Sequence, residues 1–159
     1  MGRNSQRTVK GEWDVARFDR DDAVEALAAV GTQFVSIDAD DVPAELLAAV
    51  LAEGERQARA VAVLEPPAPG DEDSGMGAWH VNARDEAHLV CSGSGVVQVV
   101  TPSGMVTAWV GAGDVMIMRG AEHRYRPLTT QEWVIRHAGP ADADLGAVDT
   151  GRAAQPWPT

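Results

Sequence analysis

The sequence predicts a mostly β domain, an antiparallel sandwich or barrel with helices in its N-terminal third. Between residues 79 and 137, short strand-like runs alternate with tight turns of sequence SGSG, TPSG and GAGD, a rhythm typical of antiparallel sheets. The first third differs, because its apolar residues recur at helical spacing. The chain has 159 residues, of which 45% are hydrophobic, so one domain with a sizeable single core is expected.

The first helix is expected over the segment DAVEALAAV. Asp21 or Asp22 can cap it, because a short acidic side chain accepts hydrogen bonds from the free N–H groups of a first turn. Gly31 follows as its C-terminal stop. The next segment, residues 33–37, reads QFVSI and is predicted to be a short strand.

A second helix is expected after Asp41, which can cap it with Pro43 in the first turn. Apolar residues at helical spacing extend it to about Ala60. Residues 61–64, VAVL, are then a candidate strand, and residues 65–78 form a loop rich in Pro, Gly and acidic residues.

Seven short strands are expected after this loop, within a barrel core of residues 79–140. Their predicted ranges are 79–81, 86–92, 96–100, 105–110, 114–118, 123–126 and 131–137. The tail, residues 141–159, has the composition of a loop, although its Trp157 is expected to dock on the barrel. Residues 1–64 are expected to pack on the barrel, which makes the chain a single domain overall.

The charge and the single cysteine limit the partners and the compartment. A formal net charge of −11 argues against nucleic acid, whose phosphates need a positive face, and against anionic membranes. No run approaches the ~18 apolar residues of a membrane helix, and the N-terminus lacks the apolar core of a signal peptide. Cys91 cannot form an internal disulfide, which suits a reducing compartment. A cytoplasmic protein is expected.

Four polar residues, His80, Asn82, Glu86 and His88, lie at even spacing in segments that otherwise read as strands. Side chains two apart share one face of a strand, so all four can converge in the barrel interior. A buried polar group without a partner costs roughly 1–3 kcal/mol, and one divalent metal ion would satisfy them together. Two imidazoles and a carboxylate suit non-haem Fe(II), and also Ni(II) or Mn(II). His123, after an apolar strand and a glycine-containing turn, is a suitable further donor.

This spacing resembles the two sequence motifs of the cupin superfamily. The first motif reads His, any residue, His, three residues, Glu, six residues and Gly, and its positions are occupied by His80, Asn82, Glu86 and Gly93. The second supplies a late histidine, here His123, after a Gly-Asp turn. The resemblance implies a cupin-type double-stranded antiparallel β-barrel, the jelly roll, with two or so N-terminal helices. It also implies metal ligands at the two histidines and the glutamate, with the asparagine as a further candidate.

Within the cupins, the chain is similar to bacterial acireductone dioxygenases from about residue 13 to 140. Shared features are a helix followed by GxxF leading into a strand, the pair DE at the first motif, and Ile135 with Arg136 in a late strand. The resemblance implies a mononuclear dioxygenase that uses O2 to cleave a small enediol-type metabolite. It implies Fe(II), with Ni(II) as the alternative, and a role in methionine salvage.

The departures from this pattern affect both the metal site and the substrate site. The family's second histidine is Asn82 here, and its arginine after the glutamate is His88. Asn82 is either a weak metal ligand or a hydrogen-bonding neighbour of one. His88 is a ligand, a substrate contact or a buried hydrogen-bonded histidine. Arg136 and Tyr125 are further catalytic candidates, with a surface ion pair and plain packing as their respective alternatives.

Three functions therefore remain open: an acireductone dioxygenase-like enzyme, a diverged cupin enzyme that acts on another small metabolite in specialised metabolism, and a non-catalytic small-molecule-binding cupin. The expected partners are a small-molecule substrate and O2, and the expected oligomeric state is a monomer or homodimer. Met76, like Tyr125, is a candidate for the pocket wall. Cys91 is out of phase with the glutamate and is predicted to be a packed thiol that faces away from the metal.

Overall fold

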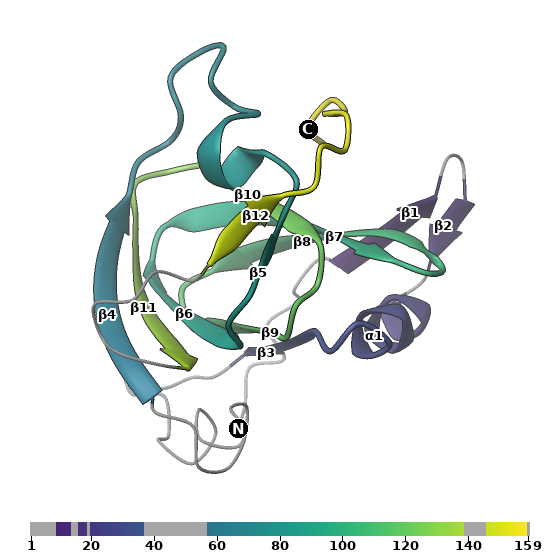
Figure 1. Ribbon diagram of the computed structural model, residues 1–159, viewed down its shortest axis with the longest axis horizontal. Coiled ribbons are helices and arrows are strands. Elements are labelled where there is room, and N and C mark those ends of the chain that lie inside the picture. Colours follow the sequence, from purple (N-terminus) through teal and green to yellow (C-terminus); the bar gives the residue numbers. More distant parts are fainter. Residues whose placement is uncertain (1–8, 14–15, 19, 37–56, 139–145, 159) are drawn as a thin grey trace.

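The structure is a computed structural model that describes residues 9–13, 16–18, 20–36, 57–138 and 146–158. Within these ranges, two antiparallel sheets pack face to face, and the α-helix α1 (Arg20–Ala28) lies at one end of them (Figure 1). A single 3-10 turn, η1 (Gly75–Gly77), precedes the motif-bearing strands among the described residues.

The larger sheet has seven strands in the order β12-β5-β10-β7-β8-β1-β2. Their bounds in that order are Ala147–Asp149, His80–Asn82, His123–Pro127, Ser94–Thr101, Gly104–Gly111, Val9–Trp13 and Ala16–Phe18. The smaller sheet has five strands in the order β3-β9-β6-β11-β4, with the bounds Gln33–Ser36, Asp114–Met118, Glu86–Ser92, Gln131–Ala138 and Gln57–Leu64. The chain passes between the sheets from β6 to β7 and from β8 to β9, as in a jelly roll.

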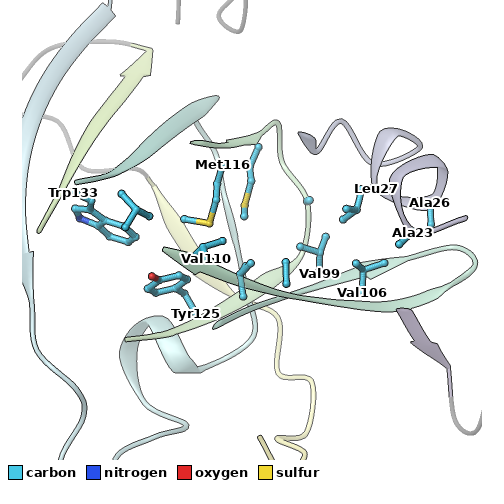
Figure 2. Packing of buried hydrophobic residues seen from close by; sticks show 14 residues of the cluster. Ala23, Ala26, Leu27, Val99, Val106, Val110, Met116, Tyr125 and Trp133 are labelled. Atoms are coloured by element: carbon cyan, nitrogen blue, oxygen red, sulfur yellow. The ribbon is translucent and has the colours of Figure 1, made fainter. Parts of the chain in front are cut away.

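The core lies between the two sheets, because alternate side chains of each strand point inward. Met116 and Trp133 from the smaller sheet face Val110 and Tyr125 from the larger one (Figure 2). At the other end of the core, Leu27 and the neighbouring alanines of α1 cover the valines of β7 and β8 (Figure 2). Each such valine or leucine contributes about 1.5–3 kcal/mol through its burial.

The motif glycine Gly93 ends β6 in a left-handed conformation with φ of +75°. A Cβ at this position would lie 2.3 Å from the carbonyl oxygen of Thr130, which is closer than two such atoms can approach. Glycine is therefore required for backbone angle and for space, and it lets the turn between β10 and β11 pack against the end of β6.

The seven strands predicted after residue 78 are all present, with ends that agree to within two residues. The smaller sheet has a second buried apolar cluster, made of Ala87, Leu89, Val115 and Ile117 with Val134 packed against it. No helix in the described ranges has the length and apolarity that a membrane span requires.

The N-terminal expectations need correction. α1 begins at Arg20, so Asp21 and Asp22 lie in its first turn and not at its cap position. The second helix was expected to end near Ala60, but residues 57–60 begin β4, which pairs with β11 along its whole length. That ladder outweighs the helical propensity of the segment QARA. The start of the second helix lies outside the described residues, and a second helix and a closed barrel are not confirmed.

Three further features were not expected. β1 and β2 add two strands to the larger sheet, and the tail supplies β12, which pairs with β5.

Cys91 is exposed, so the prediction of a packed thiol is wrong. The β6–β11 register shifts by a β-bulge at this point, and a bulge changes which face the next side chain occupies. Trp157 does dock on the sheet as expected, over Arg124.

Candidate metal centre

A pocket of about 340 Å³ lies between the two sheets. Its polar lining consists of His80 and Asn82 from β5, Glu86 and His88 from β6 and His123 from β10. Its apolar wall contains Tyr125 and Trp133, and its exposed rim contains Gly75, Met76, Ala147 and Asp149. All five predicted polar residues therefore come together, and each is at most 7% exposed.

Strand register explains this convergence. His80 and His123 are directly opposite each other in the β5–β10 pair, with ring centroids 4.4 Å apart. Asn82 shares the face of His80 because it lies two residues along β5. Glu86 and His88 share the inner face of β6 for the same reason, and the second sheet thereby presents a carboxylate to the two imidazoles of the first.

Hydrogen bonds fix which nitrogen of two imidazoles faces the pocket. Nδ1 of His80 is 2.7 Å from the carbonyl oxygen of Ala78, and Nδ1 of His123 is 2.8 Å from that of Ala121. A carbonyl oxygen only accepts, so Nδ1 is the donor and Nε2 of the neutral ring carries a free lone pair. This is the arrangement by which proteins orient histidines toward a metal.

The Glu86 carboxylate is 1% exposed and faces three polar groups. Asn82 Nδ2 donates to its Oε1 over 2.8 Å, and Nε2 of His123 lies 3.8 Å from the same oxygen. Nε2 of His88 is 3.0 Å from Oε2, but not at hydrogen-bond geometry, so Oε2 has no hydrogen-bond partner. The Nδ1 atom of His88 is buried without one as well.

The protonation states suit metal binding. Burial raises the pKa of Glu86, but His88, His123 and Asn82 together lower it by more, so the pKa lies below its ordinary value. Burial lowers the pKa of His123, and the opposing effects of Glu86 and the Ala121 carbonyl do not offset this. Near neutral pH the pair is a carboxylate and a neutral imidazole, the forms that bind metal.

The donor set fits one divalent ion. As the side chains stand, no three His, Cys, Asp or Glu residues in the described ranges form a ready-made metal site. However, the neutral His123 presents its lone pair to Oε1 of Glu86 at 3.8 Å, and a cation between these two electron-rich atoms would be attracted to both. With ligand bonds of about 2.0–2.2 Å, one ion can reach both atoms.

The other predicted residues are placed as follows. His88 lies against Trp133, with ring centroids 4.6 Å apart. The Tyr125 hydroxyl donates to Oε1 of Gln131, and burial raises the pKa of this phenol. Arg136 has its backbone in β11 opposite Ala87, while its side chain lies outside the described part. The roles predicted for these residues, and that of Asn82 as a ligand, stay predictions.

Four lining residues were missed as site residues, namely Gly75, Trp133, Ala147 and Asp149. Trp133 carries a usable signal, because it shares a strand face with Ile135 and His137 and so alternates with the residues on the other face. Ala147 and Asp149 carry none, since a three-residue strand in a loop-like tail has no detectable pattern.

No protein-family model matches the chain, and no curated protein matches it either. Among solved structures, an acireductone dioxygenase from Bacillus anthracis with a cadmium ion in its active centre is similar over 82% of this chain and 90% of that chain, with a TM-score of 0.52 and 15% identity. An oxalate decarboxylase from Lactobacillus farciminis, in a formate complex, gives a TM-score of 0.45 and 15% identity over 75% of this chain and 30% of that one. The likeness to the first of these concerns the fold alone: this chain is built as a jelly roll of two antiparallel sheets.

Proposed function

We propose that this protein is a mononuclear metal-dependent cupin enzyme, a dioxygenase that uses O2 to cleave a small enediol-type molecule. The observation that carries the proposal is the pair of Glu86 and His123, whose Oε1 and Nε2 atoms face each other at 3.8 Å in a buried pocket. The fold supports it, because the similar acireductone dioxygenase holds a cadmium ion in its active centre.

His80, Glu86 and His123 would hold the ion, and Asn82 would keep the carboxylate in place through its 2.8 Å hydrogen bond. Three such ligands suit Fe(II), with Ni(II) as the alternative. When bound, the metal supplies Lewis acidity and positions the reacting oxygens.

The chain's own residues supply the remaining steps. Tyr125 and Trp133 form an apolar wall that excludes water from one side of the pocket. His88 lies beside Glu86, with Nε2 3.0 Å from Oε2, so its imidazole is placed to accept a proton from a substrate hydroxyl. Loss of that proton makes an enediol electron-rich and reactive toward O2.

The charges in the pocket favour a substrate without a carboxylate or phosphate group. No Lys or Arg is present among the described lining residues, whereas Glu86 and Asp149 both are. An anionic substrate would meet two carboxylates without a fixed countercharge from these residues. The lack of a Lys or Arg among these residues also supports the second candidate, a diverged cupin enzyme acting on another small metabolite, because His88 stands where the acireductone dioxygenases have an arginine.

Oxygen uptake by the Fe(II)-loaded protein tests the proposal. We expect uptake above the metal-free background with acireductone as the enediol, and a fall of at least ~100-fold in Glu86→Gln, since no other described carboxylate is buried in the pocket. Metal binding without oxygen uptake would reject the dioxygenase. A binding protein or a different cupin enzyme would then remain.

A further inference from the structure

We infer that the C-terminal tail is a structural wall of the pocket and that Arg124, on the opposite face of β10 from the site, is the positioning residue that holds it there. This inference is independent of the chemistry proposed above. It concerns how the rim is held, with or without a metal.

Both segments of the rim come from outside the two predicted motifs. The tail contributes Ala147 and Asp149 through β12, which runs beside β5 (Figure 1). The loop before β5 contributes Gly75 and Met76 through η1. Neither segment belongs to a long strand, so each needs contacts elsewhere to keep its position.

Arg124 supplies these contacts. Its side chain is 0% exposed, and Nε donates to Oε1 of Gln98 over 2.7 Å on the larger sheet. Nη2 donates to the carbonyl oxygen of Gln155 in the tail over 2.9 Å, and Nη1 reaches Oδ1 of Asp73 in the loop at 3.4 Å. One guanidinium thus connects the sheet, the tail and the loop.

Two indole rings complete this set of contacts. We call the set the clasp, and it consists of Arg124 with Gln98, Gln155, Asp73, Trp157 and Trp79. Cζ of Arg124 lies 3.8 Å from the ring centroid of Trp157 and 4.9 Å from that of Trp79. Nε1 of Trp157 donates to Oδ1 of Asp73 over 3.1 Å, so the tail and the loop are also joined directly. A desolvated cation between two aromatic faces is a strong case of the cation–π interaction.

The consequence concerns the pocket, because Arg124 follows His123 directly in β10 and the clasp covers the back of the strand that carries this histidine. Without Trp157, the tail after β12 is held by the hydrogen bonds from Arg152 to Glu122 and from the Thr150 N–H to the Trp79 carbonyl oxygen. The loss of this ring would therefore open the rim more often and expose His80 and His123, which are otherwise 7% and 6% exposed. His137 is equally buried, at 3%, but does not line the pocket, and it therefore reports on general unfolding.

Carbethoxylation of histidines by diethyl pyrocarbonate, read peptide by peptide, tests the inference on the full-length protein without added metal. In Trp157→Ala we expect the rates at His80 and His123 to rise about 10-fold, with His137 unchanged. Trp157→Phe keeps a ring over Arg124 and should restore most of the protection. Val148→Ala is the matched control, since Val148 is a tail side chain that is 60% exposed and outside the clasp.

Arg124→Lys gives a second test, because lysine keeps the charge but cannot stack or reach three partners. It should resemble Trp157→Ala if it folds. Equal acceleration at all three histidines in Trp157→Ala, or no acceleration at His80 and His123, would overturn the inference. A Trp157→Phe variant as reactive as Trp157→Ala would also overturn it.

Discussion

Asn82 lies two residues after His80 in β5, and its amide donates to the Glu86 carboxylate. Groups that orient a metal ligand in this way typically contribute 10- to 100-fold to metal affinity. Asn82→Leu preserves approximate size but removes the donor, so we expect metal affinity to fall by about 10-fold or more. Competition with a chelator measures this, and unchanged affinity would show that the hydrogen bond does not position the carboxylate.

The acid sensitivity of the metal-free protein follows from Glu86 and His123, whose pKa values are both lowered in the fold. As pH falls below the ordinary histidine pKa of 6.5, His123 becomes protonated in the unfolded chain before it does in the folded chain. Below the ordinary glutamate value of 4.5, the same holds for Glu86. Stability is therefore greatest above these values and declines as pH falls.

Urea unfolding of the metal-free protein measures this decline at pH values from about 7.5 to about 4, a range that brackets both ordinary pKa values. In His123→Asn, the free energy of unfolding should depend less on pH between neutral pH and about pH 5.5. A free energy of unfolding that stays level or rises on acidification would contradict the assigned shifts.

At the scale of elements, the sequence allowed β5, β6 and β10 to be located because period-2 alternation is a local signal. The same alternation placed His80, Asn82, Glu86 and His88 on the inner faces of their strands. Residues 61–64 of β4 were predicted as a strand, but its first half and β12 were not, because pairing with β11 and with β5 is long-range. The segment QARA favours a helix in isolation, and tertiary pairing outweighs this preference. The clasp of Arg124 escaped prediction for the same reason, since Trp157 gives no sign of its partner.

The turn after β6 offers a test of element-level packing. Gly93 and Gly120 both have positive φ, +75° and +77°, but a Cβ would clash with Thr130 only at Gly93. Gly120→Ala should cost about 1–2 kcal/mol of the free energy of unfolding, from backbone strain alone. Gly93→Ala should cost at least ~2 kcal/mol more, because a backbone carbonyl must move. Equal losses in denaturant unfolding would show that the clash relaxes without cost.

At the scale of the whole molecule, two sheets of different composition meet at one site. The larger sheet supplies two imidazoles from neighbouring strands and Tyr125 of the apolar wall, and the smaller one supplies a buried carboxylate and Trp133. The tail and the loop before β5 then form the rim. The net charge of −11 favours the approach of a cation to this pocket over that of an anion.

The central claim is that His80, Glu86 and His123 hold one metal ion, and metal content per chain tests it most directly. We expect about one equivalent of a divalent first-row metal in the purified protein. His80→Ala, Glu86→Ala and His123→Ala should each lose most of it, because three protein ligands leave no redundancy. His137→Ala removes an equally buried histidine outside the pocket and should retain the metal. Full retention of metal in His123→Ala would contradict the account.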